Sequence, residues 1–176
     1  MTISCIMSEE MRVKMLAVNG RYSKKMFDLF FDKMYNEYVE KMRAQRLTPV
    51  SLAFIGDAVH TLYVRECIAE QSDGVVGTLH AAASRLVNAK CQAAVLDELI
   101  ASGALTAEEA DVARRAKNAH LHSRAKAASP DDYHKATALE AVIGYLHVSG
   151  EAERERELMK RCVETGLRLA AKQDKN

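Results

Sequence analysis

Residues 52–65 read LAFIGDAVHTLYVR, an apolar run with Gly56 and Asp57 at its centre. A run this apolar predicts a buried helix. However, a glycine inside a helix costs about 1 kcal/mol relative to alanine, and a buried carboxylate must be desolvated. Asp57 alternatively fits the N-cap of a helix that begins at Ala58, because aspartate is a preferred cap residue. The role of Asp57 therefore decides how this stretch is interpreted.

A helix through the whole stretch would have two different sides. One side is an apolar stripe formed by Leu52, Ile55, Val59 and Leu62. Asp57 lies on the other side, where its neighbours one turn away, Ala53 and Thr61, are small. His60 is on the side of Asp57, where it would either orient the acid or pack as an ordinary buried histidine.

A second mostly apolar stretch, YHKATALEAVIGYLH at residues 133–147, places Glu140 between Ala136 and Gly144, each one turn away. Small side chains let two helix backbones approach closely, so packing the two stretches together would bring two carboxylates together. Like charges held close are unfavourable unless a proton or a cation lies between them. Mg²⁺ needs only one or two carboxylates when water and phosphates fill its other positions. Taken alone, Glu140 also fits a surface position, where most glutamates lie.

Composition limits the classes of protein to which the chain can belong. It has 176 residues, 48% of them apolar and 28% charged, with a net charge of +1. These values predict one folded domain and exclude a disordered chain or a basic tail, so a polyanion site must be a local patch. The four cysteines form no CxxC pair, and no signal peptide or membrane span is visible. We expect a cytoplasmic protein with reduced thiols.

Helical periodicity dominates the rest of the chain. The only two prolines, Pro49 and Pro130, stand where helices would begin. The helices expected from apolar spacing and capping residues span residues 79–102, 106–117, 129–148 and about 151–172. We interpret the charged run EAERERE at residues 151–157 as a solvated face. No segment alternates with period two, so the expected fold class is all-α.

The first residues differ from the rest. Residues 1–25 are basic and weakly periodic, and we interpret them as a disordered leader or a mis-chosen start. The ordered domain is expected to begin near Met26 with an amphipathic helix and to run through 26–172, followed by a tail at 173–176. One stripe of that first helix would consist of Phe27, Phe30, Met34 and Tyr38.

Three of these segments together resemble a known family. LAFIGDAVHTLYVR resembles the signature of the ribonuclease III catalytic domain. SRLVNAKCQA at 84–93 and ATALEAVIGYLH at 136–147 follow in the order and at the separations of its short branch, Mini-ribonuclease III. The similarity extends from about Leu47 to Gly166. It implies an all-helical endonuclease domain that forms a homodimer through the signature helix and cuts double-stranded RNA with Mg²⁺.

The resemblance also implies which residues act and where the chain departs from the larger enzymes. Asp57 and Glu140 match the catalytic, metal-binding acids. Two further acids of the larger enzymes are replaced here by Ala53 and Thr137, as in the short branch, and Thr137 becomes a candidate for supporting the site. The chain ends too soon after residue 170 for the RNA-binding domain of the larger enzymes, so the catalytic dimer would hold RNA alone or with a partner.

The function implied is maturation of 23S ribosomal RNA precursor within the duplex formed by its paired ends. A ribosomal protein that shapes this substrate is a further candidate partner. Hydrolysis would leave a 5′-phosphate and a 3′-hydroxyl, with each subunit of the dimer cutting one strand. The alternative is a non-catalytic domain that binds double-stranded RNA or the ribosome and was silenced by the loss of two acids. Retention of Asp57 and Glu140 favours the enzyme.

Basic side chains lie in two places where they would contact RNA phosphates. The candidates are Arg85, Asn88 and Lys90 in the first place, and Arg114, Arg115, Lys117, Asn118, Arg124 and Lys126 in the second. Arg115 and its neighbours alternatively complement the dipole at the end of their helix. His120 and His122 lack further ligands for zinc, and contact with phosphate or ribose is the better interpretation.

Overall fold

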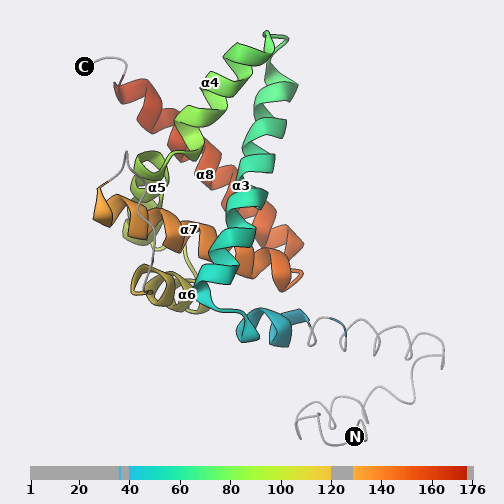
Figure 1. Ribbon diagram of the computed structural model, residues 1–176, viewed down its shortest axis with the longest axis vertical. Helices are drawn as coiled ribbons and strands as arrows, with labels where there is room; N and C mark the ends of the chain where they lie inside the picture. Colours follow the sequence, from blue (N-terminus) through green and yellow to red (C-terminus); the bar gives the residue numbers. More distant parts are fainter. Residues whose placement is uncertain (1–35, 37–39, 120–128, 174–176) are drawn as a thin grey trace, which may run out of the picture. The chain divides into compact units, whose positions relative to one another are not determined.

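The computed structural model describes residue 36 and the ranges 40–119 and 129–173. Throughout these residues the regular structure is helical, with no strand, so the all-α prediction is confirmed. A short helix, Glu40–Arg46, precedes six longer ones. These are α3 (Pro49–Gln71), α4 (Val76–Val87), α5 (Ala89–Ala101), α6 (Ala107–Lys117), α7 (Pro130–Val148) and α8 (Ala152–Gln173), shown in Figure 1.

Several predictions fall on residues outside these ranges. They are the leader at 1–25, the start at Met26, the stripe of Phe27, Phe30, Met34 and Tyr38, and the candidates His120, His122, Arg124 and Lys126. Within the described ranges no single helix is long and apolar enough to cross a membrane. The bent pair of Glu40–Arg46 and α3 meets that criterion only when its two helices are counted together.

Helix α3 runs through Gly56 and Asp57 without interruption, so the N-cap interpretation of Asp57 is wrong. The actual cap is Thr48, whose hydroxyl oxygen accepts a hydrogen bond from the Ser51 backbone N–H at 3.1 Å, and Pro49 occupies the first turn. An early cap and a favourable proline start the helix upstream of the glycine. The glycine is therefore a helix-interior residue.

The single helix predicted over 79–102 is wrong, because the chain breaks at Asn88. The backbone of Asn88 is extended, and its side-chain oxygen accepts from the Cys91 N–H at 2.9 Å, which caps α5. Its amide nitrogen donates to the carbonyl oxygens of Ser84 at 3.1 Å and Arg85 at 2.8 Å, at the end of α4. Asparagine competes with helical hydrogen bonds through such local contacts, and apolar periodicity does not reveal them.

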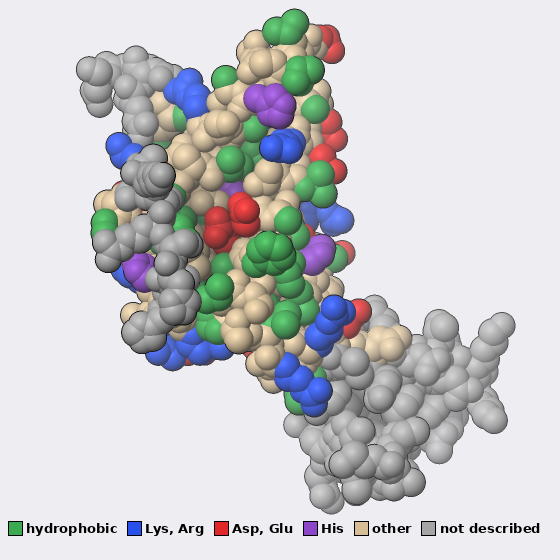
Figure 2. Space-filling model, in the orientation of Figure 1, with side chains coloured by type: hydrophobic (Ala, Val, Ile, Leu, Met, Phe, Trp, Pro, Cys, Tyr) green, Lys and Arg blue, Asp and Glu red, His purple; other side chains and the backbone are tan. Residues whose placement is uncertain are grey.

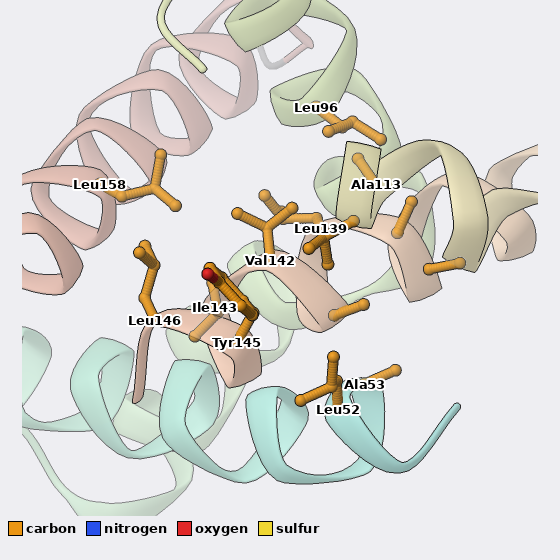
Figure 3. Packing of buried hydrophobic residues seen from close by; sticks show 14 of the residues in the cluster. Leu52, Ala53, Leu96, Ala113, Leu139, Val142, Ile143, Tyr145, Leu146 and Leu158 are labelled. Atoms are coloured by element: carbon orange, nitrogen blue, oxygen red, sulfur yellow. The ribbon is translucent and has the colours of Figure 1, made fainter. Parts of the chain in front are cut away.

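Helix α7 is the centre of the core. Its residues from Ala136 to Leu146 are buried except for Glu140, which is half-buried. Figure 3 shows Leu139, Val142 and Ile143 of α7 surrounded by side chains from α3, α5, α6 and α8. Burying one such side chain contributes about 1.5–3 kcal/mol to folding, so a carboxylate in the middle of this helix runs against its packing.

Helices α3 and α7 meet backbone to backbone at two glycines. A β-carbon at Gly56 would overlap the carbonyl oxygen of Glu140 and lie 2.8 Å from the backbone nitrogen of Gly144. A β-carbon at Gly144 would overlap the carbonyl oxygen of Leu52. No L-side chain fits at either position, and the glycines are needed for this close approach.

The buried face of α3 is not the predicted stripe. It consists of Leu52, Ala53, Gly56, His60 and Val64. Leu62, which belongs to the apolar stripe, is 59% exposed, and Phe54 is 82% exposed. Contact with α7 uses the face with small residues, and this rotates part of the apolar stripe toward the surface.

The charged run at the start of α8 is solvated only in part. Glu109, in the capping box that opens α6, is buried and accepts two hydrogen bonds from the Arg154 guanidinium, both at 2.8 Å. Arg154 also donates to the Ala104 carbonyl oxygen at 2.6 Å. The prediction of a wholly solvated face is therefore wrong at Arg154, which joins α8 to the beginning of α6.

We predict opposite effects for two glycine-to-alanine changes. Gly56→Ala should destabilise the protein by at least about 2 kcal/mol, because the added methyl group forces α3 away from α7. Gly77→Ala should stabilise it by about 0.5–1 kcal/mol, because a β-carbon on this helical glycine meets nothing within 4 Å. Urea unfolding of both variants measures the difference. Equal stability of the two variants would contradict the close packing.

Candidate active site

The α3–α7 crossing brings the two predicted acids together. Asp57 follows Gly56 directly, and Glu140 lies one turn before Gly144. Asp57 is exposed, whereas Glu140 is half-buried. Figure 2 shows acidic side chains gathered in the middle of one face, with exposed hydrophobic side chains beside them. The closeness that the small residues predicted is thus confirmed for the two helices.

The environment of Glu140 favours its uncharged form. Burial, together with the nearby negative charge of Asp57, raises the pKa of Glu140 to about 7, although a hydrogen bond from Gln92 opposes the shift. In contrast, Asp57 faces solvent. The pair therefore combines one exposed carboxylate with one that ionises less readily than an ordinary glutamate.

The donor set fits a hard divalent cation. In the described part of the chain no group of three or more His, Cys, Asp and Glu side chains is placed to hold a metal ion. One chain thus offers two carboxylates, which suffice for Mg²⁺ when water and phosphate oxygens complete its coordination. A cation between Asp57 and Glu140 would also relieve the repulsion that raises the Glu140 pKa.

Gln92 belongs to the site but was missed by sequence reasoning. It lies on α5, is 2% exposed, and contacts both Glu140 and His60. The only signal in the sequence was a polar residue on the apolar stripe that also carries Leu96 and Leu99. Apolar periodicity treats such a residue as an irregularity, although a buried amide must find hydrogen-bond partners.

His60 is buried beside the acid pair. Burial lowers its pKa to about 4, while Asp57 acts in the opposite direction. Its Nδ1 atom lies 3.2 Å from the Gln92 amide nitrogen. The structure thus places this candidate in a hydrogen-bonded chain that leads to Glu140 through Gln92.

Buried residues occupy the two positions at which the resemblance implies further acids in the larger enzymes. Ala53 is buried in the core, and Thr137 is buried with its hydroxyl donating to the Tyr133 carbonyl oxygen of the same helix at 3.0 Å. Thr61 donates a long hydrogen bond of 3.5 Å to Oδ1 of Asp57. Thr61 thus contacts Asp57, and Gln92 contacts Glu140.

The first group of basic candidates lies at the junction of α4 and α5. Arg85 and Lys90 are exposed, while the Asn88 side chain is occupied by the caps of both helices. Arg85 is in the last turn of α4, and Lys90 is in the first turn of α5. Arg85 and Lys90 thus lie on either side of the break at Asn88, one at the end of α4 and one at the beginning of α5.

The second group lies at the end of α6, and its described cations are paired with carboxylates. Asp111 accepts from Arg114 at 2.6 Å and from Arg115 at 2.9 Å, and Lys117 is 3.4 Å from Asp131. All three cations are in the last turn of α6, and Asn118 forms the C-cap. This position agrees with the helix-dipole interpretation, and exposed pairs of this kind exchange readily for other anions.

Comparison with known proteins gives consistent matches. The Ribonuclease III domain model matches residues 50–151. A Symbiobacterium thermophilum protein named Mini-ribonuclease 3 is 43% identical over 65% of this chain and 86% of its own length. A Mini-ribonuclease 3 of Brevibacillus brevis is 43% identical over 70% and 91%. The crystal structure of a Fusobacterium nucleatum protein superposes with a TM-score of 0.60 at 28% identity, covering 68% of this chain and 93% of that chain.

The raised pKa of Glu140 predicts a pH-dependent stability in metal-free buffer. Between the ordinary glutamate pKa near 4.5 and the folded value near 7, the folded protein binds more protons than the unfolded chain. The free energy of unfolding should therefore fall as the pH rises through this range. Glu140→Gln removes this effect and should stabilise the protein by roughly 1–3 kcal/mol at about pH 8, with little difference near pH 4.5.

Urea unfolding of wild type and Glu140→Gln in EDTA, from about pH 4.5 to pH 8, measures this difference. Glu66→Gln is the matched control, because it makes the same change at an exposed position of α3. A stability difference for Glu140→Gln that does not change with pH would contradict the prediction.

Proposed function

Because the chain belongs to the ribonuclease III family of endoribonucleases, we propose that it hydrolyses double-stranded RNA with Mg²⁺, leaving 5′-phosphate and 3′-hydroxyl ends. The observation that carries this proposal is the acid pair at the α3–α7 crossing, since both Asp57 and Glu140 lie within the matched residues 50–151. A protein that only bound RNA would gain nothing from two carboxylates facing a polyanion. The pair therefore favours the enzyme over a non-catalytic domain.

Asp57 and Glu140 are the residues that would hold Mg²⁺, directly or through water. When bound, the ion would supply a water of lowered pKa and positive charge beside the scissile phosphate. Glu140 must lose its proton for this role. Burial and the charge of Asp57 raise its pKa, and a cation bound between the two acids would lower that pKa again. Asp57 is exposed to solvent, so its carboxylate would be accessible to RNA and its metal ion.

The proposed substrate is the duplex formed by the paired ends of 23S ribosomal RNA precursor, in the cytoplasm, with a ribosomal protein as a possible aid. The resemblance to Mini-ribonuclease III and the relatives named Mini-ribonuclease 3 support this choice. Arg85 and Lys90 are proposed to contact phosphates of the duplex. Arg114, Arg115 and Lys117 would exchange their carboxylate partners for phosphates, and Asn118, Arg124 and Lys126 complete the proposed RNA surface. Asn88, also a candidate, would contact RNA only if its side chain left the caps of α4 and α5.

A homodimer through α3 would explain how both strands are cut. The exposed hydrophobic side chains Val50, Phe54 and Leu62 all lie on α3, near Asp57. Exposed apolar surface of this kind favours contact with another protein surface. A second copy of α3 would cover it and place a second acid pair nearby.

The cleavage test compares a long RNA duplex with a matched single strand, with and without Mg²⁺. Wild type should cut only the duplex and only with the metal. Asp57→Asn should slow cleavage by at least about 100-fold, because it removes a metal-binding oxygen charge and changes little else. Duplex binding by Asp57→Asn, measured separately, should be retained.

Duplex binding by wild type without cleavage, in Mn²⁺ as well as in Mg²⁺, would reject the enzyme. It would favour the non-catalytic RNA-binding domain, with Ala53 and Thr137 marking the lost acids.

Phe54→Asp tests the homodimer. Because Phe54 is 82% exposed, the change should leave the fold of one chain intact while placing a charge in the proposed interface. Sedimentation analysis should show a dimer for wild type and a monomer for Phe54→Asp. A dimer that persists in this variant would exclude α3 as the interface.

A further inference from the structure

Gln92 joins three helices next to the acid pair. Its side chain is 2% exposed, and a buried amide without partners would cost several kcal/mol in desolvation, about 1–3 in measured cases. It finds one partner on α3, where His60 Nδ1 is 3.2 Å from its amide nitrogen, and another on α7, the Glu140 carboxylate.

The direction of both hydrogen bonds follows from the protonation states of the two partners. An ionised carboxylate only accepts, so Gln92 donates to ionised Glu140 through its amide nitrogen. A neutral imidazole with its proton on Nε2 accepts at Nδ1, and His60 is buried in a setting that favours the neutral ring. One nitrogen with two hydrogens thus serves both partners.

His60 also determines which way the amide faces. With the His60 proton on Nε2 and Glu140 ionised, turning the Gln92 amide by half a rotation would point its oxygen at two acceptors, Nδ1 and the carboxylate. Both contacts would then become repulsive. The orientation with the nitrogen toward Glu140 is therefore the one that the His60 ring stabilises.

We propose that Gln92 is a positioning residue that holds the Glu140 carboxylate toward Asp57, and that His60 keeps the Gln92 amide turned for this task. The need is physical, because two carboxylates repel each other and an unrestrained Glu140 side chain would turn away from Asp57. A donated hydrogen bond from a buried amide opposes that movement. The inference rests on the proposed nuclease function, since it assigns a role to the same site.

Gln92→Met is the suitable variant, because methionine has a similar length and flexibility and lacks the amide. A first experiment needs no metal and no RNA. The fall in melting temperature caused by Gln92→Met is measured at about pH 8 in EDTA, in wild type and in a Glu140→Ala background. If Gln92 donates to Glu140, the fall should be larger in wild type by about 3 °C. A residue that only fills space would cause the same fall in both.

A second experiment measures single-turnover cleavage of an RNA duplex with protein in saturating excess. Gln92→Met should cut about 10- to 100-fold more slowly and need more Mg²⁺, with duplex affinity unchanged, as is usual when a partner of a metal ligand is lost. His60→Leu should slow cleavage in the same direction by a smaller factor, because Gln92 is still present. Gln71→Met, the same change at an exposed glutamine of α3, is the matched control and should cut at the wild-type rate.

The outcomes separate this inference from the proposed function. If wild type fails to cut the duplex, the function fails, while the melting experiment still tests the contact between Gln92 and Glu140. If wild type cuts and Gln92→Met cuts equally fast, or if the melting effects are simply additive, the inference is overturned. Should Gln92→Met unfold, His60→Leu gives the rate measurement with Gln92 in place, and a wild-type rate would reject the role of His60.

Discussion

Where α3 crosses α7, the two backbones touch at Gly56 and Gly144, and this contact fixes the distance between the helices. Neither helix can move outward without losing the packing of Leu139, Val142 and Ile143, and neither can move inward. Asp57 and Glu140 lie beside this contact, so the distance between the two helices also determines how close the two acids come. The main chain itself, and not a flexible loop, therefore sets the geometry of the candidate site.

The same contact makes the site a source of instability. Glu140 is the one residue between Ala136 and Leu146 that is not fully buried, and its charge is opposed by burial and by Asp57. Packing across the rest of α7 has to offset this. In the free protein the charged form of Glu140 is unfavourable, and a bound cation would stabilise it. Carboxylates at functional sites often have shifted pKa values for this reason.

Sequence reasoning was sufficient where a local pattern has one structural meaning. The helices expected from residues 106 and 129 correspond to α6 and α7, whose N-caps are Thr106 and Ser129. The small residues around Asp57 and Glu140 predicted the crossing. It was insufficient where side-chain hydrogen bonds decide the outcome. Asn88 breaks a helix by bonding to backbone groups on both sides, and Gln92 interacts with residues 32 and 48 positions away in the chain, His60 and Glu140. Apolar spacing contains no information on either contact.

The paired glycines also restrict how the chain can change in evolution. When two side chains pack together, enlarging one is often compensated by shrinking the other. At Gly56 and Gly144 that route is closed, because the partner is already the smallest residue and the obstructing atoms belong to the backbone. A substitution at either position has no second-site suppressor at the other. Both codons should therefore be fixed more strictly than those of the large apolar residues around them.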